Sequence, residues 1–285
     1  MSNTDHDMTS HSSMDERFFR LVETPFVKNH QQSWELLEDR LREHGVKPAV
    51  RFTLSRTYWA AAAFLILLGT FSVLRFYTTV TLTEHGQHLS CILPDGSSAQ
   101  LNAGSRISYH PLWWRFSRDI RFEGEGYFEV QKGKPLRVRS AIGTTEVLGT
   151  SFTIYAREEE YRVTCFRGVV RVESNTGDEA VLTSDYTASV GSRGDITVIR
   201  ADNPTSAASW VKGMFSFTSR PLRIVLDEIQ RQYNVTVHFD LDGQYLFTGY
   251  FSKERPPEEV LELVCKPFGL TFVKKSTGAY DIVQN

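Results

Sequence analysis

An uncharged apolar stretch from Tyr58 to Leu74 restricts what this chain can fold into more than any other feature. As an α-helix, with about 1.5 Å of rise per residue, it covers roughly 25 Å, close to the ~30 Å hydrocarbon core of a bilayer. Arg56 and Arg75 flank the stretch and can extend their charged ends to the two membrane surfaces. A core helix would carry a polar stripe, which this stretch lacks, and a signal peptide would begin near the N-terminus. We therefore predict one transmembrane helix over residues 56–77.

Basic residues are distributed unequally on the two sides of this predicted span. The 20 residues before Thr57 contain five of them, whereas the 20 residues after Leu74 contain only Arg75. Because basic residues concentrate on the cytoplasmic side of a membrane, the N-terminus is predicted to be cytoplasmic. Residues 1–55 would then lie inside, and the long remainder would lie outside.

The composition and the absence of known motifs argue against several classes of function. A net charge of −2 argues against the broad basic surface that direct nucleic-acid binding needs. The sequence has no Cys-x-x-Cys, His-Glu-x-x-His or phosphate-binding loop, so we expect no cofactor, no metal and no enzyme of a known motif class. His85 and His88 are interpreted as solvated loop residues. Cys91, Cys165 and Cys265 lie in apolar stretches and are expected to be buried free thiols, with a Cys91–Cys165 disulfide as the alternative.

The segment before the span contains two short amphipathic patterns. Isolated helices of about 10 residues are only marginally stable in water, and two helices this short bury little of each other's apolar faces. We expect their exposed stripes to contact a partner protein, the alternative being a juxtamembrane helix that only leads into the span. The candidate contact residues are Phe18, Leu21, Trp34, Leu37 and Leu41.

Residues 80–200 have the pattern of an all-β unit. Short stretches of alternating polar and apolar residues are separated by turns rich in Gly, Asn, Asp and Pro, and no helix of 10 residues is indicated. We predict a β-sandwich or a flattened, solenoid-like stack of hairpins.

Five motifs of this unit resemble, in order, the FecR family of single-span regulators of extracytoplasmic-function sigma factors. The motifs are Leu93-Pro-Asp-Gly-Ser, Leu101-Asn-Ala-Gly-Ser, Phe122-Glu-Gly-Glu-Gly-Tyr-Phe-Glu-Val, Val147-Leu-Gly-Thr-Ser-Phe-Thr-Ile and Phe166-Arg-Gly-Val-Val-Arg-Val. The resemblance implies a bacterial inner-membrane protein whose outer domains are periplasmic and whose cytoplasmic segment binds a sigma factor. The chain departs from the family at Leu182-Thr-Ser-Asp-Tyr, where members carry a Leu-x-Pro-Gly-Glu-like turn, so the last hairpin is expected to differ.

Residues 212–285 contain an internal repeat with an offset of 35, in which Val225-Leu226 matches Val260-Leu261. Each copy is predicted to form a strand, a helix started by Pro and a second strand, with both helices on one face of a single small sheet. The unit resembles the short N-terminal domain of secretins and TonB-dependent transducers. That resemblance implies pairing with the signalling domain of an outer-membrane TonB-dependent transporter.

The last strand of the repeat is the candidate for this pairing, because an exposed sheet edge can accept a strand from a partner. An interior position is the equal alternative. The strand consists of Tyr280, Asp281, Ile282 and Val283.

Two places are candidates for chain cleavage. The resemblance implies self-cleavage at Gly149-Thr150, where the Thr hydroxyl would attack the preceding carbonyl. The favoured alternative is that Gly149 supplies an unusual backbone conformation. The resemblance also implies release of the sigma factor by periplasmic and intramembrane proteases. Gly69, Thr70 and Ser72 soften the span and mark the candidate intramembrane site.

These observations together predict a mainly β chain with an α+β end, two short N-terminal helices and one membrane span. The predicted function is that of a membrane-bound anti-sigma factor. An envelope scaffold with a membrane anchor is the rival interpretation.

Overall fold

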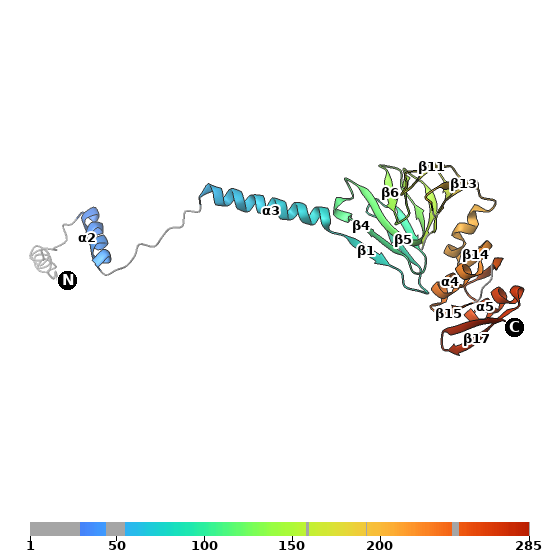
Figure 1. The fold of residues 1–285 in the computed structure, drawn as a ribbon. Helices are drawn as coiled ribbons and strands as arrows, with labels where there is room; N and C mark the ends of the chain where they lie inside the picture. Colours follow the sequence, from blue (N-terminus) through green and yellow to red (C-terminus); the bar gives the residue numbers. More distant parts are fainter. Residues whose placement is uncertain (1–28, 44–54, 158–159, 192, 241–244, 285) are drawn as a thin grey trace, which may run out of the picture. The chain divides into compact units, whose positions relative to one another are not determined.

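The structure is a computed structural model that describes residues 29–43, 55–157, 160–191, 193–240 and 245–284. The chain divides into two compact units, Met1–Ala63 and Phe64–Asn285, and the elements appear in chain order in Figure 1. In the first unit, helix α2 (His30–Glu43) confirms the second of the two predicted N-terminal helices. The first predicted helix, with Phe18 and Leu21, lies outside the described residues.

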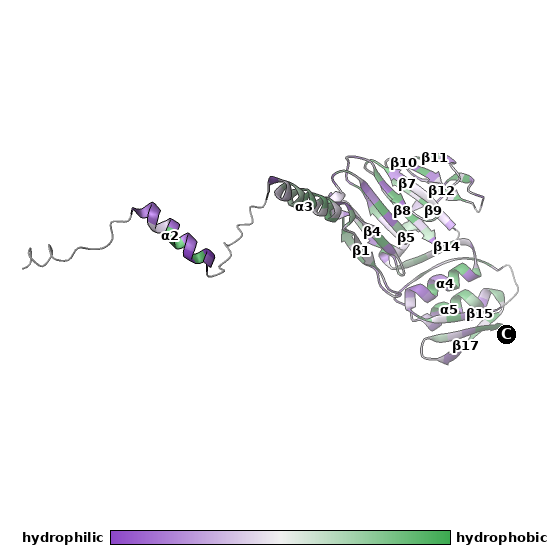
Figure 2. Cartoon of the chain, turned by 60° about the vertical axis from the view of Figure 1, so that its left-hand side comes forward, coloured by the Kyte–Doolittle hydropathy of each residue, from purple (hydrophilic) through white to green (hydrophobic). Residues whose placement is uncertain are grey.

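Helix α3 (Arg56–Phe76) coincides with the predicted span and is long and apolar enough to cross a membrane. None of its side chains is buried against the rest of the protein, which distinguishes it from the core helix of a soluble domain. By contrast, α2 carries both hydrophobic and hydrophilic residues (Figure 2). The composition of α3 therefore suits an apolar environment, and that of α2 suits the boundary between water and an apolar surface.

Thirteen strands follow α3 and form a β domain, which we define as residues 79–200. Strand β5 (Arg118–Glu129) belongs to both halves of the domain. Its first part pairs with β4 and β6, and its second part pairs with β3 and β8. The first half has the order β1-β4-β5-β6-β7-β10-β11, and the second has the order β2-β3-β5-β8-β9-β12-β13. The other strands are β1 (Thr79–Leu82), β2 (Leu89–Ile92), β3 (Ser98–Leu101), β4 (Arg106–Tyr109), β6 (Leu136–Arg139), β7 (Gly143–Val147), β8 (Ser151–Arg157), β9 (Glu160–Arg167), β10 (Val170–Ser174), β11 (Glu179–Leu182), β12 (Tyr186–Val190) and β13 (Ile196–Arg200).

One hydrophobic core lies between the two halves, which confirms the predicted sandwich. Ile107 and Ile120 enter it from the first half, and Phe128 and Phe152 enter it from the second. Strand β5 passes from one half to the other at Gly124, whose φ of +108° and contact with Ser105 leave no room for a side chain. Within the described residues of this domain the only helical element is the short turn η1 (Pro111–Trp113).

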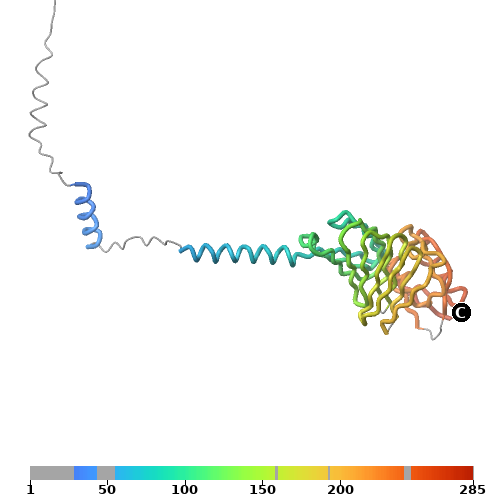
Figure 3. Tube along the Cα trace, turned by 90° about the horizontal axis from the view of Figure 1, so that it is seen from above, coloured from blue at the N-terminus to red at the C-terminus, as the bar shows by residue number. Residues whose placement is uncertain are grey.

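The C-terminal domain, which we define as residues 214–284, follows the helical turn η2 (Pro204–Lys212). Figures 1 and 3 show it lying against the β domain. The predicted repeat is confirmed as β14-α4-β15 followed by β16-α5-β17, and the equivalent helical pairs Val225-Leu226 and Val260-Leu261 share one core. The elements are β14 (Met214–Pro221), α4 (Leu222–Tyr233), β15 (Thr236–Phe239), β16 (Leu246–Ser252), α5 (Pro257–Cys265), η3 (Lys266–Phe268), β17 (Leu270–Ser276) and β18 (Ala279–Gln284).

The predicted single sheet is wrong, because the strands of the repeat divide between two sheets. The first strands of the two copies, β14 and β16, pair with each other, whereas the second strands, β15 and β17, flank β18. Strand β18 is therefore the centre of a three-stranded sheet, so of the two alternatives for Tyr280–Val283 the interior position is correct and the edge position is wrong. The physical reason is burial, since Tyr280 and Ile282 both enter the domain core. The edges of this sheet belong to β15 and β17.

Candidate functional site

An apolar stripe on α2 is the first candidate site. Trp34, Leu37 and Leu41 have the spacing of one helix face, and their exposed fractions are 57%, 47% and 41%. No residue of α2 is buried. Among the described residues the stripe therefore has no covering partner, as the sequence predicts for a binding segment.

The Gly149-Thr150 bond lies between β7 and β8 in tightly packed surroundings. Gly149 does not have a positive φ, so the expected unusual backbone conformation is wrong. A side chain at this position would instead meet Lys132, whose Cγ lies 2.6 Å from an ideal Cβ. Thr150 is buried, and its hydroxyl donates a hydrogen bond to the Val169 carbonyl oxygen at 2.9 Å. Close packing and this hydrogen bond account for both residue types without any cleavage chemistry.

We therefore expect the purified chain to be intact across this bond. Mass spectrometry of the wild-type protein and of Thr150→Ala should give a single full-length mass for both, differing only by the substitution. A fragment ending at residue 149 in the wild type, and absent from Thr150→Ala, would instead establish self-cleavage.

The third predicted site lies on α3. Gly69, Thr70 and Ser72 belong to one uninterrupted helix, and apart from the adjoining helix itself none of the described residues lies within 4 Å of an ideal Cβ at Gly69. Any softening of α3 at these residues therefore comes from their intrinsic helix propensities rather than from a visible break.

A buried polar network joins the β domain to the C-terminal domain, and the sequence did not indicate it. The Asn102 side-chain amide, at the end of β3, donates to Glu125 at 2.7 Å and to Glu228 at 3.3 Å. Gln232, one helical turn after Glu228 on α4, donates to Glu228 at 2.7 Å and to the Asn102 side-chain oxygen. We call these four residues the interdomain joint. A pair of polar residues at i and i+4 beside the apolar stripe of α4 was the available signal.

The two carboxyl groups of the joint titrate in opposite directions. Burial, reinforced by the charge of Glu228, raises the pKa of Glu125 to about 7. Burial also acts to raise the pKa of Glu228, but the guanidinium groups of Arg231 and Arg157 outweigh it and hold this pKa below its ordinary value. Below about pH 7, Glu125 is therefore mostly protonated while Glu228 remains ionised.

Further contacts surround the joint. Arg220 on β14 makes two hydrogen bonds to Glu160 on β9, at 2.6 and 3.1 Å. The His88 imidazole donates to the Gln232 side-chain oxygen at 2.8 Å and contacts the Trp210 ring. His88 is an exposed loop residue, as predicted, but it also contacts the C-terminal domain, and partial desolvation lowers its pKa.

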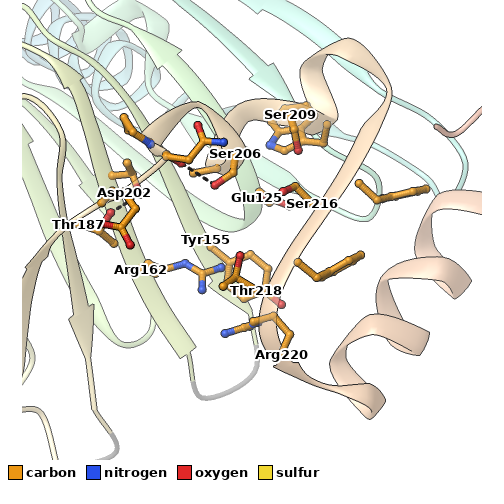
Figure 4. A pocket seen from close by; sticks show the side chains of 18 of the residues that line it. Glu125, Tyr155, Arg162, Thr187, Asp202, Ser206, Ser209, Ser216, Thr218 and Arg220 are labelled. Carbon is orange, nitrogen blue, oxygen red and sulfur yellow. Dashed lines mark hydrogen bonds between the residues drawn. The ribbon is translucent and has the colours of Figure 1, made fainter. Parts of the chain in front are cut away.

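Beside the joint lies a cavity of about 390 Å³ (Figure 4). Its two lining arginines, Arg162 and Arg220, both pair with Glu160 on β9. Arg162 pairs with Glu160 at 3.1 Å and stacks over the Tyr155 ring, and Arg220 takes the other Glu160 oxygen. This arrangement holds the two domains together.

Among the described residues no group of three His, Cys, Asp or Glu side chains could hold a metal ion. Cys91, Cys165 and Cys265 are free thiols, and Cys165 and Cys265 are buried. Burial raises the pKa of each of these two thiols to about 11, so both are unreactive near neutral pH.

Comparisons with known proteins match both outer domains. The family model described as FecR protein matches residues 79–171, and the model described as FecR, C-terminal matches residues 214–279, together more than half of the chain. Two crystal structures of a protein from Parabacteroides distasonis, described provisionally as an anti-sigma factor, are each 25% identical to this chain with a TM-score of 0.67. Each match covers 73% of this chain and 99% of that one. A comparison with curated proteins finds no match. The two matched regions coincide with the sandwich and with the repeat domain, and they show that the chain belongs to the FecR family.

Proposed function

We propose that this protein is an anti-sigma factor of the bacterial inner membrane. Helix α3 crosses the membrane once, the N-terminal segment binds an extracytoplasmic-function sigma factor in the cytoplasm, and the two outer domains are periplasmic. The observation that carries the proposal is the combination, in one FecR-family chain, of an unburied apolar helix and a separate exposed apolar stripe on α2. The excess of basic residues before α3 supports the orientation.

Co-purification of the full chain with each candidate sigma factor of the same genome tests the proposal. Capture of one sigma factor, lost when residues 1–43 are removed, is the expected result. Failure to capture any of them, with the chain shown to be inserted and folded, would favour the envelope scaffold instead.

We further propose that the C-terminal domain receives the signal from an outer-membrane TonB-dependent transporter. Since β18 is central, the candidate for pairing in this sheet is β17, the longer of its two edge strands. Val273 on β17 is 44% exposed. A cysteine at Val273 is expected to cross-link to a cysteine on the transporter's signalling domain, whereas a cysteine at Val181 on β11 is the control that should not.

Release of the sigma factor is proposed to involve intramembrane proteolysis near Gly69, Thr70 and Ser72. Replacing Gly69 and Thr70 together by leucine should strengthen the helix by about 1–1.5 kcal/mol and make its local opening roughly tenfold rarer. We expect release of the N-terminal fragment to slow by a similar factor, measured by blotting after induction. The matched control is Ala62→Leu. A wild-type fragment whose C-terminus lies outside residues 65–75 would refute this site.

A further inference from the structure

The loop between β4 and β5 exposes large apolar side chains. Leu112 is 46% exposed and Phe116 is 68% exposed, and the Trp113 ring packs on Phe116 with their centroids 4.6 Å apart. The loop is anchored from inside, because Trp114 is buried and packs edge-on against Tyr109. An apolar cluster held at the surface in this way indicates a partner surface.

The chain itself places this loop at the end of the membrane helix, within the compact unit Phe64–Asn285. Strand β1 begins three residues after α3, and its Thr79 pairs with Tyr109, the last residue of β4. His110 then contacts the Tyr77 carbonyl oxygen at 3.1 Å. Whatever surface α3 emerges from must therefore lie close to residues 110–117.

Aromatic contacts reach from the loop into α3 itself. The Trp113 ring packs edge-on against Phe71, with centroids 5.8 Å apart, and the Arg75 guanidinium lies 5.6 Å from the same ring. Phe71 belongs to the apolar part of α3, and Arg75 is its last charged residue. Trp113 thus lies at the level where a membrane helix passes from hydrocarbon to headgroups, the level that Trp favours.

A basic cavity of about 330 Å³ adjoins the apolar cluster. Arg75, Arg121, Arg139 and His110 line it, against one carboxylate, Asp119. Asp119 lies 3.5 Å from Arg139, which leaves Arg75 and Arg121 facing the cavity without a carboxylate partner in the described residues. Guanidinium groups of this kind bind phosphate oxygens.

We propose that the 110–117 loop lies in the interface of the same phospholipid bilayer that α3 crosses, with Leu112, Trp113 and Phe116 at the acyl boundary and the arginine cavity at the headgroup phosphates. The proposal rests on the membrane span of the proposed function. The β domain would then contact the bilayer at two places, through α3 and through the 110–117 loop, rather than through α3 alone.

The test uses the full chain in nanodiscs of phosphatidylcholine with phosphatidylglycerol. A polarity-sensitive fluorophore is attached to single cysteines introduced as Leu65→Cys, Leu112→Cys or Val181→Cys, and the native chain gives the labelling background. Lipids with a quencher on the acyl chain report depth. We expect strong quenching at 65, roughly half as much at 112 and none at 181, because interfacial side chains enter about 5–10 Å.

Quenching at 65 but not at 112 would overturn the loop proposal while leaving the span intact. No quenching at 65 would overturn both. As a second measurement, Phe116→Ser should reduce quenching at 112 and Phe116→Trp should preserve it. Arg121→Gln should also reduce it, and more strongly in nanodiscs that contain phosphatidylglycerol than in phosphatidylcholine alone. Equal quenching in all three variants would mean that residue 112 reports a protein contact and not lipid.

Discussion

Trp34→Ala should weaken sigma-factor binding by at least roughly 30-fold, which corresponds to about 2 kcal/mol. The reason is that Trp34 is the largest side chain of the exposed α2 stripe and would be removed from water on binding. Because none of α2 is buried in the free protein, the substitution removes no packing within the described structure. Titration of the full chain with the captured sigma factor measures the effect directly.

The matched control is Asp39→Ala, on the opposite face of the same helix. It lies about 140° from Trp34 at 100° per residue, so it should change the affinity by less than about threefold. Alanine also favours the helix, which keeps helicity from confounding the comparison. Equal losses for both substitutions would mean that the stripe is not the binding face. An unchanged affinity for Trp34→Ala would mean that Trp34 does not contribute to the binding face.

Local patterns predicted most of the architecture. The span, the second N-terminal helix, the sandwich and the β-α-β repeat each rest on a pattern of residues that is confined to one stretch of chain. The pairing of strands that are distant in the sequence produces no comparable local pattern. The placement of β18 between β15 and β17, and the division of the repeat into two sheets, depend on which buried faces meet.

The interdomain joint could not be predicted from the sequence for the same reason. Asn102 and Glu125 in the β domain meet Glu228 and Gln232 more than 100 residues later, and each is an ordinary polar residue in its own segment. The contact of His88 with Gln232 likewise depends on how the two domains pack together. If the C-terminal domain receives the signal as proposed above, these contacts are the route by which it would reach the β domain.

The two carboxyl groups of the joint should respond oppositely to substitution. Glu228→Gln removes the charge that Arg231 and Arg157 face, and disrupting a buried ion pair in this way costs about 3–5 kcal/mol. We expect this variant to unfold at markedly lower temperature at pH 8. Glu125→Gln removes a carboxyl group whose ionised form is disfavoured by burial and by Glu228, so at pH 8 it should be neutral or stabilising.

The pH dependence separates the two effects. Since the pKa of Glu125 is about 7 when folded and ordinary when unfolded, the folded state binds the extra proton between about pH 4.5 and pH 7. The contribution of Glu125 to stability is complete below this window and is lost as the pH rises through 7. Glu228 has the opposite sign: its folded pKa is lowered, so its contribution is present above its ordinary pKa and is lost only in more acidic solution.

Thermal unfolding of the full chain from pH 5 to pH 8 tests this reasoning. The wild type should lose stability across the range by about 1–3 kcal/mol, and Glu125→Gln should flatten the profile. Glu228→Gln should also make it shallower, because it removes the neighbouring charge that helps to raise the pKa of Glu125. Glu123→Gln, an exposed position on the same strand, is the control and should follow the wild type. A profile that Glu125→Gln leaves unchanged would show that Glu125 does not take up a proton in this range, and the pH dependence of the joint would be refuted.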